Sequence, residues 1–359
     1  MELFFRFLLK GYRKVLHRFY KLDRRAVMPR GELCSVSHFK FLENHGDIVH
    51  PCVRYSAGGF RGYNWWMVYT PYYDANADIE NPILCFGVGN ANAGPSVWEP
   101  YCEIIGKPLS GYNSDPTMFF DEDSLFIYWR ENFTPRAAKA NLSRATYGCV
   151  LSEKQKIDID TPILCEKAEY EDKQVSPVIL KRCDTYVAYA MHLTFLNPQF
   201  SSSYAIVQRL IRSCLGIAST LGIYSDQKSH GISIWKSDSP NEKFKYSKTI
   251  AVENCNPLYR PWHLDCFEHN EKLYAVIQTT QCNADICLAV SQDWETFVMY
   301  STPLLTNAST GKVGLYKPCG FVHRDIFYLY YTAQDESDRS LNSLYITSLP
   351  MSQLLAEVQ

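Results

Sequence analysis

Three carboxylic acids in the chain could transfer protons during bond cleavage. Asp115 lies in the run YNSDP, Asp265 in the run PWHLD, and Glu80 in an Asn-containing loop. Cleavage of a glycosidic bond usually needs one carboxylic acid that protonates the leaving oxygen and one carboxylate that acts as nucleophile or base. We therefore predict that Asp115 is the base or nucleophile and that Glu80 or Asp265 is the acid.

A second set of polar and aromatic residues could hold the substrate of this chemistry. His50 and His263 could orient the substrate, tune a neighbouring carboxylate or donate to a developing charge. An aspartate before a proline often only caps a turn, and aromatic strand residues more often belong to a core, so each assignment has a structural alternative. The predicted substrate-binding residues are His50, His263, Arg130, Glu131, His192, Tyr72, Trp262, Tyr316 and Lys317.

Metal and cofactor sites have little support in the sequence. His50, Glu80, His263 and Asp265 could together hold a divalent metal, but no local ligand spacing supports such a site. The chain also shows no Gly-rich phosphate loop, nucleophile elbow or dinucleotide fingerprint. We therefore predict neither a metal nor a cofactor.

These residues must be positioned by a repeated β unit. Each copy has a polar residue before or near a proline, a strand, a turn and a Tyr- or Trp-rich second strand. Copies begin at His50, Asp115, Ser176, Pro261 and Lys317. Long repeats of this kind are typical of four-stranded blades arranged around an axis, so we predict an all-β, five-bladed β-propeller. The first strands of all blades would then bring their polar starts to one axial pocket.

The propeller is predicted to span residues 37–350, with two helical additions. The long third interval contains a helical insertion in blade three, about residues 197–228. The last copy leaves little chain for an outer strand, so we expect a segment at about 37–42 to complete blade five and protect its edge. Residues 1–30 form a predicted basic amphipathic helix.

The basic helix has two open interpretations, contact with an anionic membrane through residues 1–25 or docking on the propeller or another copy. Residues 1–30 carry nine Lys or Arg against Glu2 and Asp23, a formal charge of +7, so the remainder carries −9 of the net −2. An acidic body argues against a nucleic-acid partner. Thirteen cysteines without a CxxC pair favour a reducing compartment. We expect a cytoplasmic protein, peripheral on the membrane if the helix binds lipid.

Several stretches resemble known carbohydrate-active propellers. They are HPCVRYSAGGFRGYNWWMVYTPYYDANADIENPI, YNSDP, PWHLD and LYKP, within residues 48–350. They resemble five-bladed β-propeller proteins related to glycoside hydrolase families 43 and 32. The resemblance implies a glycan-directed pocket and, more loosely, a hydrolase with a carboxylate triad. The chain departs from that triad, because His50 stands where family 43 enzymes place an Asp base and Ser176 is not an acid.

Three functions therefore remain open from the sequence. The first is a glycoside-hydrolase-type enzyme that cleaves or transfers a glycosyl unit of an oligo- or polysaccharide. The second is a glycosyltransferase of cytoplasmic polysaccharide assembly at the membrane surface. The third is a glycan-binding propeller without catalysis. Fold kinship alone does not rank them, because one fold hosts many activities.

Overall fold

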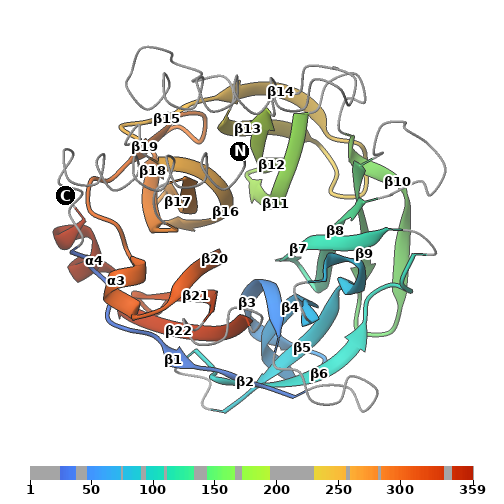
Figure 1. Ribbon diagram of the computed structural model, residues 1–359. Helices are drawn as coiled ribbons and strands as arrows, with labels where there is room; N and C mark the ends of the chain where they lie inside the picture. Colours follow the sequence, from blue (N-terminus) through green and yellow to red (C-terminus); the bar gives the residue numbers. More distant parts are fainter. Residues whose placement is uncertain are drawn as a thin grey trace, which may run out of the picture.

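The computed structural model shows an all-β, five-bladed propeller, as predicted (Figure 1). It describes residues 25–37, 47–73, 76–89, 94–108, 111–132, 144–165, 172–194, 230–255, 259–281, 284–334 and 342–358. The insertion at 197–228 and most of the predicted helix at 1–30 lie outside these residues, so both stay predictions. In the part of the chain that the structure describes, no helix combines the length and apolarity needed to cross a membrane.

Each blade is an antiparallel sheet built from consecutive strands, with the first strand innermost. Blade one contains β3 (Ile48–Phe60), β4 (Tyr63–Pro71), β5 (Ile83–Val88) and β6 (Val97–Glu103). Blade two contains β7 (Tyr112–Asp121), β8 (Ser124–Asn132), β9 (Arg144–Leu151) and β10 (Lys156–Cys165). Blade three contains β11 (Asp172–Arg182), β12 (Thr185–Thr194), β13 (His230–Ser237) and β14 (Lys245–Ile250).

The last two blades include short additional strands. Blade four contains β16 (Tyr259–His269), β17 (Lys272–Gln281), β18 (Ile286–Ser291), β19 (Phe297–Met299) and the parallel β15 (Val252–Glu253). Blade five contains β20 (Val313–His323), β21 (Ile326–Gln334) and β22 (Asn342–Pro350). The described helices are η2 (Ala77–Ile79), α3 (Asn307–Thr310) and α4 (Met351–Glu357).

The ring is closed by a strand that precedes the predicted one. β1 (Glu32–Leu33) pairs antiparallel with β22 and completes blade five, while β2 (Ser35–Val36) pairs with β6 in blade one. The prediction of residues 37–42 for this role was wrong, because the Ser37 amide already bonds to Trp98 of blade one. A two-residue strand has no periodicity that a sequence could show. Closure still protects the last sheet edge.

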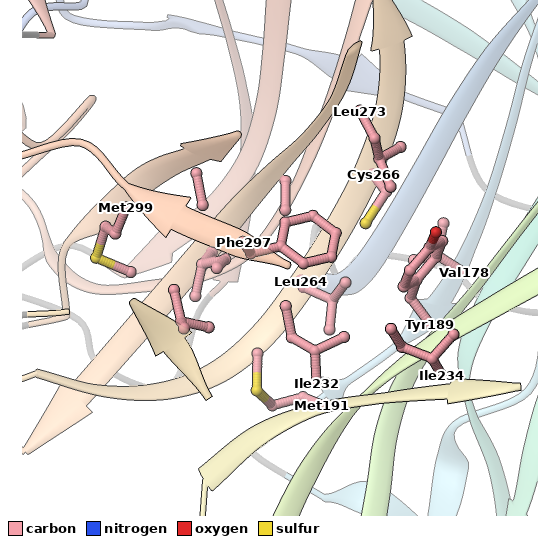
Figure 2. Close-up of a cluster of buried hydrophobic side chains, with 14 of the residues drawn as sticks. Val178, Tyr189, Met191, Ile232, Ile234, Leu264, Cys266, Leu273, Phe297 and Met299 are labelled. Atoms are coloured by element: carbon pink, nitrogen blue, oxygen red, sulfur yellow. The ribbon is translucent and has the colours of Figure 1, made fainter. Parts of the chain in front are cut away.

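Apolar side chains between neighbouring blades form the core. Between blades three and four, Val178, Tyr189, Leu264 and Cys266 belong to one cluster (Figure 2), and the rings of Tyr189 and Phe297 in it lie 5.7 Å apart. All five side chains are buried. Because strand residues alternate between faces, every blade presents one such surface to each neighbour. The blades are thereby fixed around the axis, where the polar ends of their inner strands meet.

Candidate active site at the propeller axis

A β-bulge recurs near the start of every blade. The pairing of the two inner strands shifts there by one residue in all five sheets. In four blades the bulge contains a residue that precedes proline and has a positive φ: His50 (57°), Asp115 (49°), Ser176 (53°) and Lys317 (28°). This conformation is costly for residues other than glycine and is concentrated at functional sites. Bulges also re-aim side chains, so these positions are candidates for a shared site.

Asp115 is the centre of the resulting axial cluster. Its Oδ1 lies 3.5 Å from His50 Nε2 and 3.5 Å from His263 Nδ1. Ser176 Oγ lies 3.4 Å from the same oxygen and 2.6 Å from His263 Nδ1. The second carboxylate oxygen, Oδ2, accepts a bond of 3.4 Å from Arg130. Four blades therefore meet at one buried carboxylate. We call His50, Glu80, Asp115, Ser176, His263 and Tyr316 the axial cluster.

Glu80 lies behind His50 as seen from Asp115. Its Oε2 is 2.9 Å from His50 Nδ1 and accepts a bond of 3.1 Å from Thr70 Oγ1. The imidazole of His50 thus stands between two carboxyl groups, one at each ring nitrogen. The predicted loop position of Glu80 is correct, at the end of η2, but the side chain is buried and its carbonyl accepts a bond from the Asn113 amide. Glu80 is fixed in the cluster and does not overhang it.

The pKa values of the two carboxyl groups in the cluster are shifted in opposite directions. Burial raises the pKa of Asp115, but the two imidazoles and Arg130 outweigh burial and hold that pKa well below its usual range. Burial raises the pKa of Glu80, and the contact with His50 opposes this only in part. Burial also lowers the pKa of His263 well below its usual value, and the charge of Asp115 opposes this only in part. Two carboxyl groups with oppositely shifted pKa values are a pattern of acid–base sites.

Four more predicted residues reach this region. Tyr316 presents its hydroxyl 3.3 Å from His50 Nε2, and its ring lies 4.6 Å from that of His263. Arg130 bonds to Asp115. Lys317 donates to the Leu264 carbonyl at 3.1 Å. Tyr72 is half-buried, and burial together with the Glu80 charge raises its pKa. These residues give the cluster an aromatic and cationic border.

Asp265 does not join the cluster. Its carboxylate forms a bidentate pair with Arg54, at 2.8 and 3.2 Å, and accepts the Gly320 amide at 3.1 Å. Although Asp265 stands two residues after His263 on β16, it meets a cation from across the axis. The structure thus favours a structural role for this residue over the predicted role of acid.

Three other predicted binding residues lie apart from the described contacts of Asp115. His192 bonds through Nδ1 to Gln174 at 3.2 Å. Trp262 packs against the core between blades three and four. Glu131 is half-buried, and burial raises its pKa. His192 and Glu131 were predicted at the axis from strand position, and Trp262 was predicted as an aromatic ring that could stack on a sugar.

Sequence reasoning missed two residues that bond to the predicted carboxylates. Thr70 bonds to Glu80 and lies 3.1 Å from His50 Nδ1, and Arg54 neutralises Asp265. Ser176 was expected at the axis but was not assigned to the site. For Thr70 and Ser176 the available signal was position, because both lie at or opposite the bulges. No local signal marked Arg54.

The cluster also offers donors for a metal ion. One donor atom each from His50, Asp115 and His263 lies within 4.8 Å of the others, and all three side chains are buried. The set differs from the four residues weighed from the sequence, because Asp115 replaces Asp265 as the acidic member and Glu80 bonds to His50 instead.

Comparison with known proteins identifies the fold. No known family profile and no curated protein matches the chain. An N-acetylgalactosamine deacetylase from F. plautii, solved with blood group B trisaccharide, superposes with a TM-score of 0.66 at 13% identity, over 93% of this chain and 98% of that one. A family 43 glycoside hydrolase from Xanthomonas citri gives 0.55 at 13% identity, over 86% and 90%.

A third similar structure comes from a different group of enzymes. Levansucrase from Bacillus subtilis gives a TM-score of 0.56 at 10% identity, over 94% of each chain. At these identities the likeness shows the fold alone. The chain is a five-bladed β-propeller of the kind found in the glycoside hydrolase family 43 and family 32-like enzymes.

Proposed function

We propose that the chain is a carbohydrate-active enzyme whose reaction takes place at the axial cluster. One observation carries the proposal: the bulges of three blades and the start of β16 bring His50, Ser176 and His263 around the buried carboxylate of Asp115. Burying charged and polar groups costs folding free energy, and strained residues persist only where the surroundings hold them. An assembly of this kind is therefore better explained by chemistry than by packing.

The substrate class is supported by the proteins that share the fold. The F. plautii deacetylase was solved with a trisaccharide, and the Xanthomonas citri enzyme with xylose and with xylotriose. We infer an oligo- or polysaccharide as the partner of this chain.

The first candidate reaction cleaves or transfers a glycosyl unit. Asp115, ionised beside Arg130, would act as base or nucleophile. Glu80 would protonate His50 at Nδ1, and His50 would give the proton of Nε2 to the leaving oxygen, which would lie beside Asp115 because Nε2 faces that carboxylate. This arrangement differs from the usual pair of carboxyl groups that directly flank the scissile bond. Asp265 is excluded from the scheme by its pairing with Arg54.

The second candidate reaction removes an acyl group from an amino sugar by hydrolysis. Its support is the composition of the centre, in which the Asp115 carboxylate stands between two imidazoles and Glu80 contacts the far ring nitrogen of His50. Amide hydrolysis needs an activated water and stabilisation of an oxyanion, not two carboxylates at a fixed separation. The F. plautii deacetylase also has a TM-score of 0.66 with this chain.

The experiment measures the two reactions separately. The purified full chain is incubated with a panel of N-acetylated and unmodified oligosaccharides, and released acetate and new reducing ends are quantified. Asp115→Asn should lower kcat about 100-fold or more, with a small change in substrate affinity. Asp121→Asn, at the far end of the same strand β7, serves as the matched control.

The outcomes separate the candidates. Acetate alone supports deacylation, and new reducing ends or transfer products support glycosyl chemistry. Binding without turnover of any sugar would leave a glycan-binding propeller. An Asp115→Asn variant with full turnover would refute the axial cluster as the active site. The glycosyltransferase alternative requires an activated sugar donor and is tested by adding sugar nucleotides to the same assay.

A further inference from the structure

The donors around Asp115 have the spacing of a metal-binding site. Four ligands about 2.0–2.2 Å from a tetrahedral zinc ion lie about 3.3–3.6 Å from one another. Asp115 Oδ1 lies 3.5 Å from His50 Nε2 and 3.5 Å from His263 Nδ1. All three donors lie within 4.8 Å of one another, so a small closure would place them around one ion.

The outer contacts of these donors also fit a metal site. A metal-binding histidine usually donates its other ring N–H to a carboxylate, which fixes the ring and its tautomer. His50 has this arrangement, because Glu80 lies 2.9 Å from Nδ1 while Nε2 points toward Asp115. Arg130 bonds to Asp115 Oδ2 and leaves Oδ1 directed at the two imidazoles. The carboxylate of Glu80 thereby orients His50, and the cation of Arg130 orients Asp115.

The contact of Ser176 with the donor atom of His263 provides a further observation. Ser176 Oγ lies 2.6 Å from His263 Nδ1 and 3.4 Å from Asp115 Oδ1, so its hydroxyl borders the space between these two donors. An ion bound there would replace these two hydrogen bonds and would have the Ser176 oxygen beside it. The other ring nitrogen of His263, Nε2, points away from this space, and it is buried without a hydrogen-bond partner among the described residues.

From these observations we propose that the axial cluster binds one divalent transition-metal ion, Zn²⁺ by preference, through His50, Asp115 and His263. Two imidazoles and one carboxylate match zinc better than calcium or magnesium, which prefer oxygen donors. Three protein ligands leave a coordination position for water, as in catalytic zinc sites. The role of the ion in hydrolysis rests on the proposed function, whereas its binding does not.

The test measures binding directly. The full chain is stripped with a chelator and titrated with Zn²⁺ by calorimetry and with Co²⁺ by visible absorption. We expect one ion per chain and a Co²⁺ spectrum typical of four-coordinate nitrogen and oxygen ligands. Absence of saturable binding would overturn the proposal. A thiolate-to-cobalt charge-transfer band would also overturn it, since it would place the ion on one of the thirteen cysteines.

Variants locate the ion. Asp115→Asn and His263→Gln should weaken Zn²⁺ binding more than 100-fold, and Glu80→Gln should weaken it about 10- to 100-fold at unchanged stoichiometry. His269→Ala, at the end of the same strand as His263, should bind as the wild type does. Wild-type affinity in Asp115→Asn or His263→Gln would refute the site. If these variants do not fold, Glu80→Gln and the wild-type Co²⁺ spectrum still decide.

The failure of this proposal differs from the failure of the proposed function. Sugar turnover that survives complete metal removal would refute a role for the ion and leave the function intact. Stoichiometric metal binding on the predicted ligands without turnover of any carbohydrate would refute the function and leave the metal site intact.

Discussion

Replacement of Asp265 by asparagine should destabilise the propeller without removing any residue of the axial cluster. The carboxylate pairs with Arg54 through two bonds, at 2.8 and 3.2 Å, and accepts the Gly320 amide at 3.1 Å. The side chains of Arg54 and Asp265 are 13% and 4% exposed. The variant would leave a guanidinium buried without its counter-charge.

The expected magnitude follows from that burial. Removing one partner of a buried ion pair costs about 3–5 kcal/mol, mainly because the remaining charge has lost both water and its partner. Replacing both partners, as in Arg54→Met with Asp265→Leu, should restore most of the free energy of unfolding, because neither charge is then buried. The double variant should therefore be more stable than Asp265→Asn alone.

Urea unfolding followed by tryptophan fluorescence measures these free energies. Glu295→Gln is the control, because its pairs with Lys236 and Lys248 are at the surface and should be worth about 1 kcal/mol or less. A loss below about 1 kcal/mol in Asp265→Asn, with no gain in the double variant, would refute the structural role. Full stability combined with lost turnover would instead restore the predicted catalytic role of Asp265.

Three further predictions concern regions outside the cluster. The turn residues Asn270 and Glu271 lie between the paired residues His269 and Lys272, and both have positive φ, at 50° and 61°. Glycine adopts positive φ without strain, so Glu271→Gly should raise the urea midpoint by the equivalent of about 0.5–1 kcal/mol. Burial raises the pKa of Asp293, but bonds from the amides of Glu295 and Thr296 outweigh it and lower the pKa to about 2. The ionised Asp293 should therefore stabilise the fold fully above about pH 4, the pKa of an aspartate in the unfolded chain, and this stabilisation should be lost as the pH falls toward 2. Solvent screening limits the contribution to about 1 kcal/mol. Asp293→Asn should remove this pH dependence from the urea midpoints. Deletion of residues 1–25 should abolish flotation with anionic liposomes and leave the thermal midpoint of the propeller unchanged.

Each of these predictions has an opposing result. A destabilised Glu271→Gly variant would show that the glutamate side chain contributes more than the turn strain costs. An unchanged acid response in Asp293→Asn would assign that response to other carboxylates. Equal flotation of the full chain and the deletion variant would favour docking of the basic segment on protein.

The repeated bulge explains how much of the site the sequence could predict. A polar residue before proline is a local pattern, and the positions of His50, Asp115 and Ser176 at the starts of inner strands follow from it. Their shared location follows once five units are arranged around an axis. The expectation that they converge is correct for the same reason that the five-bladed fold was predictable: strand alternation and proline positions are properties of short segments.

Pairings across the axis were not predictable in this way. His263 and Asp265 have the same strand, nearly the same burial and a spacing of two, yet the first meets Asp115 and the second meets Arg54, which is 211 residues away in the chain. Glu80 likewise was predicted as a candidate acid on a loop, and only the structure shows that it is buried in contact with His50. The separation of two residues along the sequence does not indicate whether their side chains form an ion pair or a hydrogen bond across the axis.

The amino-acid sequence by itself therefore determined the blades, their number and the polar character of their inner ends. The tertiary structure alone decided which carboxylate is central, which supports an imidazole and which neutralises a buried arginine. The physical reason is range: strand formation depends on neighbours a few residues apart, whereas ion pairs and metal ligation depend on separations of a few ångströms between side chains from different blades.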